Sequence, residues 1–511
     1  MNDNIDPDPD PGKEEKKNDV PDDDYQLGGR PPLITLLIMS LGPLISQIVQ
    51  ALTSVIGSIL VANSIGQIGV EVYGAVYTVE FFAVAIAQFL SAGISVRLSY
   101  LYGAQQLDET HQLFVDFLRI SVILGIITPC IVLPVTQPVI RWFGADEETA
   151  HLALLYMSPI TGGCVFNIIF LVSSGVILAD GKSVTYAVFQ VVSFVLNIGI
   201  FAPILLLLIK TPIWGASLAT ILSQAIPGLI ITALIFKGKY RIEPKLNMFC
   251  KPFCGETKHA LKIGFSTLIS QISLTLPFLL MQKYVNNAAT AINQYGNAVA
   301  VWAVVEKLYL IVGGICIGFS TGFLNPGSYA YGAKNIKRML RLFLHGLWLC
   351  TLCCLIISII IISMPVEISK LWSTSASFLE MSKAITPILY YTAFTLGVQY
   401  MVPVLLQATK RIFASSALSI LTLVLPVPVF STILYFTGDG KANPRRIFFT
   451  YTCNDMYSFV VCILFFIKPL KRIITSIKTG IVEGSEEEEK SEGEEETVQN
   501  MDQQERPANE I

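Results

Sequence analysis

Charged residues and histidines are scarce in this chain of 511 residues. Lys, Arg, Asp and Glu together make up 14% of it, and there are four histidines, whereas an ordinary soluble domain carries roughly 25% charged residues. The HExxH and aspartate-rich metal motifs are missing from the sequence, and no stretch resembles the selectivity loop of a channel. We therefore expect no enzyme, with a membrane-embedded enzyme kept as the lowest-ranked alternative.

Long uncharged segments take the place of the missing charge. Hydrophobic residues make up 53% of the chain, and residues 33–68 and 183–209 hold no charged side chain. A spanning helix needs about 20 mostly apolar residues. The apolar runs predict twelve spans, near 33–62, 70–100, 112–140, 149–179, 183–209, 214–236, 261–284, 295–331, 339–365, 380–408, 412–436 and 446–467. The predicted fold is an all-α integral membrane protein with twelve transmembrane helices.

The two ends of the chain are acidic and poor in apolar residues, and the first 30 residues lack the apolar core of a signal peptide. Residues 1–32 and 469–511 are therefore expected to be disordered tails. The ten cysteines lie mostly inside apolar runs, where we interpret them as packing residues. The pair Cys250 and Cys254 falls short of four zinc ligands, so we expect no metal site and no cofactor.

Two parts of the sequence repeat each other. "SYLYGAQQ" at 99–106 returns as "SYAYGAKN" at 328–335, and "LISQI" at 44–48 returns at 268–272. The repeat divides the chain into a first half at 33–236, a linker at 237–260 and a second half at 261–468. Because each half has an even number of spans, both enter the membrane from the same side. The sequence thus predicts two parallel six-helix repeats around a central cleft.

Basic residues favour one side of the predicted membrane. The loops after the even-numbered spans contain most of them, namely Arg97, Lys182, Lys237, Lys239, Arg241, Lys245, Lys251, Lys258, Lys334, Lys337, Arg338, Arg341, Lys410 and Arg411. Lys441, Arg445 and Arg446 are an exception on the other side. The positive-inside rule then places both termini in the cytoplasm.

Three carboxylates lie inside predicted spans: Glu80, Glu306 and Asp455. An acid inside a membrane is energetically costly, so each is a candidate for coupling to a cation. Each acid also has a purely structural alternative. Glu80 would cap a water pocket without moving an ion, and Glu306 would lie next to Lys307, whose side chain extends to the membrane surface. Asp455 would hydrogen-bond a neighbouring polar group and stabilise helix packing. Uncharged polar side chains in the spans either line a cavity or bridge helices; they are Asn197, Gln47, Gln50, Gln190 and Gln271.

Proline in a spanning helix removes a backbone hydrogen bond and bends the helix. Pro426 and Pro428 lie close together in the eleventh predicted span. They are the best hinge candidates in the sequence, and a fixed kink is the alternative.

Four motifs resemble those of the multidrug and toxic compound extrusion (MATE) family. They are Pro326 with "YGAKN" at 331–335, "FGADEETAHLALLY" at 143–156, Asn197 in the fifth span, and "GASLATILSQA" at 215–225. Their pattern is most similar to the branch of the bacterial DNA-damage-inducible members. The resemblance implies a secondary transporter that exports organic, usually cationic, compounds in exchange for protons or sodium.

The same resemblance implies that the partners are a small organic substrate, a coupling cation and the lipid bilayer, with no nucleic acid. We expect a monomer in the plasma membrane. The runner-up function is a lipid-linked oligosaccharide flippase of the same superfamily.

The chain departs from the branch at the usual coupling positions. Members of that branch carry an Asp late in the first helix and another four residues after the Asn of the fifth helix. Here those regions hold Ile56 and Gly57, and Phe201. Either Glu80, Glu306 and Asp455 have taken over the role, or coupling has changed. The substrate and the coupling ion are open at this point.

Overall fold

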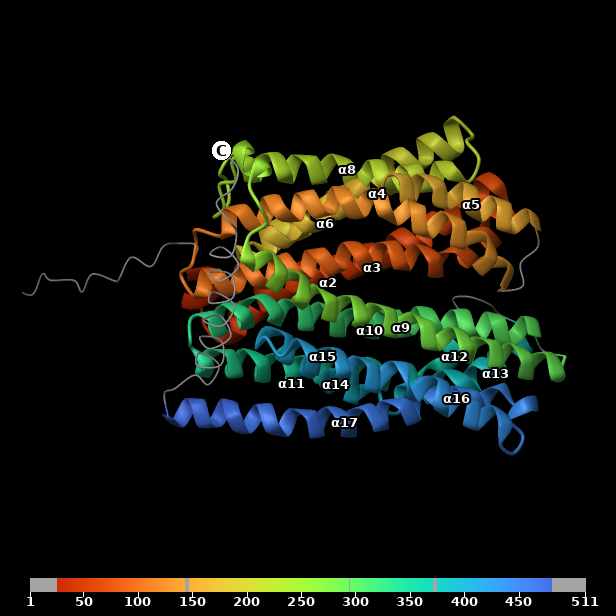
Figure 1. The fold of residues 1–511 in the computed structure, drawn as a ribbon. Helices are drawn as coiled ribbons and strands as arrows, with labels where there is room; N and C mark the ends of the chain where they lie inside the picture. The colour runs from red at the N-terminus through yellow and green to blue at the C-terminus, as the bar shows by residue number, and fades with distance from the viewer. Residues whose placement is uncertain (1–24, 143–146, 294, 371–374, 480–511) are drawn as a thin grey trace, which may run out of the picture.

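The computed structural model describes residues 25–142, 147–293, 295–370 and 375–479, and every regular element in them is a helix. Figure 1 shows the first half, in red to yellow-green, lying alongside the second half, in green to blue.

The first half contains six helical units. They are α2 (Pro32–Ile65), α3 (Gln67–Gly103), α4 (Thr110–Trp142), α5 (Glu147–Gly162) with α6 (Cys164–Ala179), α7 (Ser183–Phe194) with the π-helical segments η2 (Val195–Phe201) and η3 (Ile204–Leu208), and α8 (Trp214–Phe236). The α5 and α6 helices form one span that is bent by 49°.

The second half also contains six units. They are α9 (Gly255–Ala291), α10 (Tyr295–Gly332), α11 (Ile336–Ser363), α13 (Ala376–Ile385) with the 3-10 turns η5 (Thr386–Tyr390) and η6 (Ala393–Thr395) and with α14 (Leu396–Ala408), α15 (Ile412–Ser419) with the π-helical η7 (Ile420–Val424) and α16 (Pro426–Phe436), and α17 (Pro444–Thr479). Short helices η1 (Tyr25–Gly29), η4 (Leu246–Cys250), α12 (Pro365–Ser369) and η8 (Gly440–Ala442) lie between them.

The lengths and hydropathies of these units fit a membrane protein. In the described residues, eight helical stretches are long and apolar enough to cross a bilayer, and the bent α5 and α6 pair makes a ninth. The α9, α10 and α17 helices complete the twelve units. The predicted all-α membrane fold is confirmed.

The internal repeat is visible in the backbone. Gln105 and Lys334, which are 229 positions apart, both adopt left-handed conformations with φ of 59° and 55°. The N–H of the next residue in each case bonds back to a carbonyl of the preceding helix, at 3.0 Å for Gln106 and 2.8 Å for Asn335. This is the usual way to end a helix with a left-handed residue. The two halves therefore share the geometry of their turns as well as their sequence motifs.

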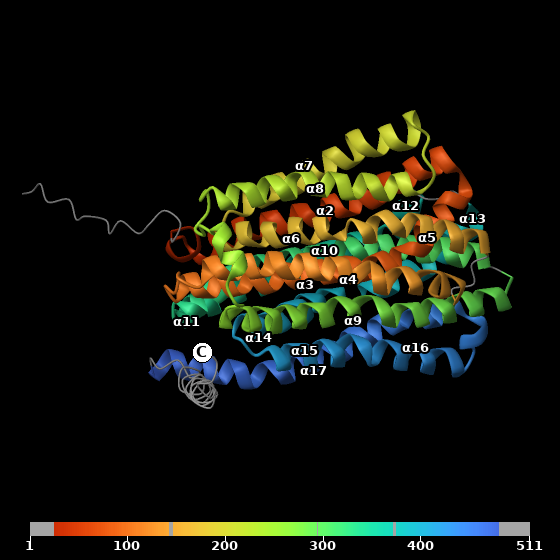
Figure 2. The ribbon, with the colours of Figure 1, turned by 45° about the horizontal axis from the view of Figure 1, so that its top comes forward.

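Small residues allow the two halves to approach closely. The α2 helix packs on α10, and α3 packs on α9. Figure 2 shows the helices of the two halves running alongside one another. On α10, a Cβ at Gly318 would overlap Leu44, and a Cβ at Gly322 would overlap Ser40. Glycines spaced four apart let membrane helices come together along their backbones.

The two copies of the repeated motif meet each other. A Cβ atom at Gly103 would overlap the carbonyl oxygen of Tyr329, and one at Gly332 would overlap the carbonyl oxygen of Tyr100. The rings of Tyr100 and Tyr331 lie 6.2 Å apart. Each copy therefore needs its glycine because the backbone of the other copy occupies that space, and the halves are held together at this end.

The ordered chain extends beyond the predicted spans at both ends. The α17 helix continues to Thr479, although the predicted span ends at 467 and the predicted tail begins at 469. Pro469 and Ile473 are buried, and Ile473 packs in the core of the second half. Near the start, Leu27 is buried and its carbonyl accepts hydrogen bonds from Arg338. These contacts correct the predicted boundaries at 32 and 469; residues 1–24 and 480–511 lie outside the described residues.

The predicted linker at 237–260 is attached to the first half. The Asp116 carboxylate on α4 accepts hydrogen bonds from the Cys254 N–H and the Thr257 hydroxyl, both at 2.8 Å. Arg119 donates to the Met248 carbonyl at 2.9 Å. The last residues of the predicted linker form the first turns of α9.

Candidate functional site

The first half contains a small pocket between its helices. It is lined by Thr53, Gly57, Leu60, Tyr73, Tyr156, Asn197, Ile198, Ala202, Leu206, Ala216 and Thr220. At its edge, the Tyr156 hydroxyl donates a long hydrogen bond of 3.4 Å to the Glu80 carboxylate. The rings of Tyr73 and Tyr156 meet edge to face, with centroids 5.8 Å apart. The pocket thus places two aromatic rings beside one acid.

Asn197 enters this pocket from the π-helical segment η2. Its amide donates to the Thr220 hydroxyl of α8 at 3.3 Å. Isolated π-helical turns within α-helices are frequent at functional sites, and here the extra residue in the turn accompanies a polar side chain in an otherwise apolar span. Asn197 therefore lines this pocket, and its predicted role in transport or coupling stays a prediction.

One of the departures from the family pattern lies in the same pocket. Gly57 lines it, and a Cβ at this position would lie 2.9 Å from the Tyr73 hydroxyl. The missing side chain leaves room for the tyrosine ring. The first half therefore has an acid at position 80 and aromatic hydroxyls in the space beside Gly57.

The second half holds its carboxylate in a closed environment. Asp455 on α17 is 1% exposed. Its Oδ2 atom accepts a hydrogen bond of 3.0 Å from the Thr392 hydroxyl. Its Oδ1 atom is buried and has no hydrogen-bond partner within the described residues. A buried carboxylate oxygen without a donor is energetically unfavourable unless a proton or a cation joins it.

The break in the tenth span creates this environment. Thr392 lies between the 3-10 turns η5 and η6, where the helix is interrupted. From α14, the Gln399 amide donates to the Asp455 backbone carbonyl at 3.1 Å and to the Thr395 hydroxyl at 3.2 Å. Irregular backbone at membrane depth is tolerated where protein or water satisfies its polar groups. The break and the acid therefore belong to one polar network.

The other predicted residues are placed as follows. Glu306 is on α10, and its side chain lies outside the described part of the structure. Gln190 is 8% exposed, Gln47 and Gln271 are half-buried, and Gln50 is exposed. The structure forms two separate sites, around Glu80 and around Asp455. Within the described residues, none of these four glutamines is a hydrogen-bond partner of either acid. A fifth glutamine, Gln224, accepts a hydrogen bond of 2.6 Å from Asn167 and bridges two helices.

The proline pair marks a change of helix geometry. The eleventh unit is α-helical in α15, π-helical in η7, and α-helical again from Pro426 onward. Pro426 is buried at the first turn of α16, and Pro428 is half-buried. Pro426 and Pro428 lie where the π-helical segment changes to an α-helix. Their role as a hinge stays a prediction.

Several site residues escaped the sequence analysis. Tyr73 and Thr392 lie in apolar runs, and nothing in the local pattern separates them from packing residues. Gln399 is a polar side chain inside a predicted span, and that was the available signal for it. Tyr156 ends the family motif at 143–156, which was the available signal for it.

Comparisons with known proteins agree on one family. A family model described as MatE matches residues 43–203 and 266–431, so one match falls in each half. The chain is 20% identical over 405 residues to "Probable multidrug resistance protein YoeA" of Bacillus subtilis, covering 77% of this chain and 85% of that protein. It is 23% identical over 370 residues to "Multidrug export protein MepA" of Staphylococcus haemolyticus, covering 71% and 79%.

Solved structures share the fold. A MOP superfamily transporter from Pyrococcus furiosus, described as having a binding pocket of reverse polarity, superposes with a TM-score of 0.80 at 20% identity, covering 89% of this chain and 98% of that one. A multidrug resistance MATE family transporter in an outward-facing conformation superposes with a TM-score of 0.79 at 21% identity, with the same coverage.

Proposed function

Because the chain belongs to the MatE family, we propose that it exports organic compounds, mainly cationic ones, in exchange for protons or sodium ions. Members of this family are transporters and not enzymes. The names of the curated relatives refer to multidrug resistance and multidrug export. Those names support the substrate class proposed for this chain.

The observation that carries the coupling proposal is Asp455. Its Oδ2 atom is fixed by Thr392, whereas its buried Oδ1 atom lacks a donor within the described residues. In this state the open position is best filled by a proton on the carboxyl group or by a small cation. Binding and release at Asp455 as the two halves move would couple the ion gradient to export.

The first-half pocket supports the cationic substrate class. Tyr73 and Tyr156 line one small pocket, and the Glu80 carboxylate lies beside it at the Tyr156 hydroxyl. Organic cations are attracted both to aromatic faces and to a nearby carboxylate. We therefore assign substrate contact to this pocket and ion coupling to Asp455.

The proposed test uses purified protein in liposomes. Efflux of a fluorescent organic cation is followed under an imposed proton gradient and then under a sodium gradient. The parent should respond to one of them, and D455N should lose at least tenfold of that response because it cannot change its charge. D439N removes an exposed loop carboxylate and should behave like the parent. Unchanged gradient dependence in D455N would exclude the coupling role.

We also propose a monomer in the plasma membrane with both termini in the cytoplasm. The excess of basic residues in the loops on that side supports this orientation. Cys250 in η4 is exposed and offers a native reporter. A membrane-impermeant maleimide should label it only after cells are permeabilised, and C250S identifies its share of the signal. Labelling of Cys250 on intact cells would reverse the orientation.

A further inference from the structure

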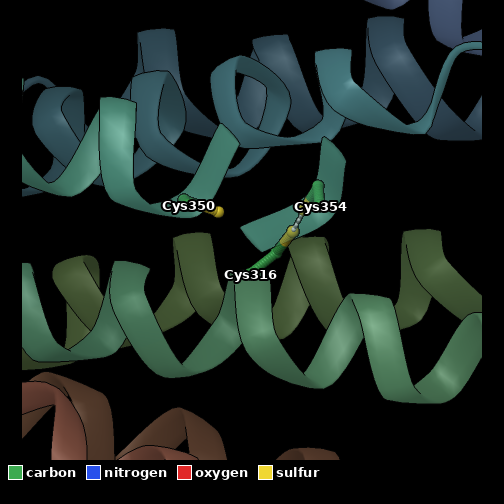
Figure 3. A group of neighbouring side chains, drawn as sticks. All are labelled: Cys316, Cys350 and Cys354. Atoms are coloured by element: carbon green, nitrogen blue, oxygen red, sulfur yellow. Dashed lines mark hydrogen bonds between the residues drawn. The ribbon is translucent and has the colours of Figure 1, made fainter. Parts of the chain in front are cut away.

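Three cysteines meet in the core of the second half, and Cys354 lies close enough to Asp455 for the two groups to interact electrostatically. Cys350 and Cys354 are four residues apart on α11 and therefore share one face of that helix. Cys316 faces them from α10 (Figure 3). The Cys316 and Cys354 sulfurs are 3.4 Å apart, and all three sulfurs lie within 4.8 Å of one another.

These sulfurs are thiols in an apolar enclosure. A disulfide would require a sulfur–sulfur distance of about 2.05 Å, and all three cysteines are free. Each is 0% exposed, and they lie in a cluster of buried apolar side chains that includes Val312 and Leu396. A ligand bound here must coordinate three sulfur atoms, and its complex with the three cysteines must be nearly neutral, because a buried charge without a partner is unstable.

We propose that Cys316, Cys350 and Cys354 form a binding site for a neutral trivalent metalloid hydroxide, with arsenous acid, As(OH)3, as the representative ligand. Three As–S bonds form and three As–O bonds break. Each thiol proton leaves with one hydroxide as water, so the reaction releases three waters. No electron is transferred, and the bound product carries no net charge.

Charge balance favours this ligand over a soft metal cation. Thiolates also bind Cu(I), but three thiolates around one Cu(I) would leave a net charge of −2 among apolar side chains. Zinc prefers four ligands, and the group found in the described residues offers three. A ligand that arrives and remains neutral avoids the cost of burying charge.

The test measures binding, not transport, so it does not depend on the export proposal. The reduced full-length protein in detergent is incubated with arsenite without oxygen and then desalted. Mass spectrometry should find about one arsenic per chain, and X-ray absorption should show three sulfur neighbours and no oxygen. C316A, C350A and C354A should each lower retained arsenic at least tenfold.

C462A is the matched control, because Cys462 is also buried in the core of the second half but lies outside the cluster. It should retain the parent amount. Only variants that elute at the parent volume are compared. Equal retention in the parent and in the triple alanine variant, or oxygen neighbours around the arsenic, would overturn the proposal. Retention of Cu(I) but not of arsenic on the same three cysteines would overturn the ligand assignment.

Discussion

The two halves share a backbone plan and differ in their chemistry. The first half holds Glu80 at the edge of a small pocket, where Tyr156 reaches it with a hydrogen bond of 3.4 Å. The second half encloses Asp455, which Thr392 binds at 3.0 Å. The turns and the interlocking glycines are repeated, whereas the polar groups are not. Duplication has preserved what positions the helices and has allowed the side chains inside each half to diverge.

The broken spans show the same difference. The fourth unit bends between α5 and α6, near Gly163, whereas its counterpart, the tenth, is interrupted by two 3-10 turns. The fifth and eleventh units both contain π-helical turns, but only the first of these carries an asparagine. The fourth and tenth units are therefore interrupted by different means, whereas the fifth and eleventh units share the type of interruption but not the polar side chain.

The largest expected effect comes from breaking the contact that the two repeats share. G103A places a Cβ against the backbone oxygen of Tyr329, which cannot rotate away. We expect a loss of about 3 kcal/mol in the free energy of unfolding, at the upper end for overpacking, and a similar loss for G332A. Thermal unfolding in detergent measures the loss of stability, and transport in liposomes measures the loss of activity that accompanies it.

G162A is the control for this pair, because no atom lies within 4 Å of the position of its Cβ. It should unfold like the parent. Equal stability of G103A and G162A would show that the two motifs do not need this close approach.

The turn after the fourth span should make the stability of the protein depend on pH, whereas the equivalent turn after the tenth span should not. Burial raises the pKa of Asp180, in the turn after α6, from 3.8 to about 6, although Lys182 and Arg241 partly oppose the shift. The corresponding residue in the second half, 229 positions later, is Thr409. The folded protein then binds this proton more tightly than the unfolded chain, so stability should fall as pH rises from about 4 to 6 and then level off.

The full shift corresponds to at most about 3 kcal/mol. Thermal unfolding midpoints between pH 4 and 8 measure this slope. D180T copies the second half and should reduce the slope. An identical slope in D180T would assign the pH dependence to other groups.

Removing the donor to Asp455 should have a smaller effect. T392V leaves the Oδ2 atom without the hydroxyl that now binds it, and an unsatisfied buried acceptor costs about 1–3 kcal/mol. Combining T392V with D455N should restore much of that loss, because an amide demands less from its surroundings than a carboxylate. A double-mutant cycle on unfolding measures the coupling, and strict additivity would show that the two groups do not interact.

The smallest effect is expected in the first half. Y156F removes a long hydrogen bond to Glu80 but keeps the aromatic ring. We expect a change in stability of about 1 kcal/mol or less and a reduction of transport of only a few-fold. Y186F is the matched control, since its hydroxyl bonds Ser46 at 3.3 Å outside the pocket. A loss of transport in Y156F as large as in D455N would contradict the division of roles between the halves.

The spans, the repeat and the family followed from the sequence, because hydrophobic runs and short motifs are local features of the chain. The family motif at 331–335 stands at the end of α10, where the left-handed Lys334 ends the helix. The boundaries at 32 and 469 were wrong because the burial of Leu27 and Ile473 depends on residues elsewhere in the fold.

The sequence by itself determined where the helices are and that they are built twice. Only the tertiary structure decided which polar groups meet. Thr392 reaches Asp455 across 63 positions, and Tyr156 reaches Glu80 across 76. Cys316 meets Cys354 across 38 positions, although the local sequence around each of them indicates only a packing role. The physical reason is that a membrane-spanning helix follows from a local run of apolar residues, whereas a hydrogen bond or a ligand site requires side chains from different helices at defined distances.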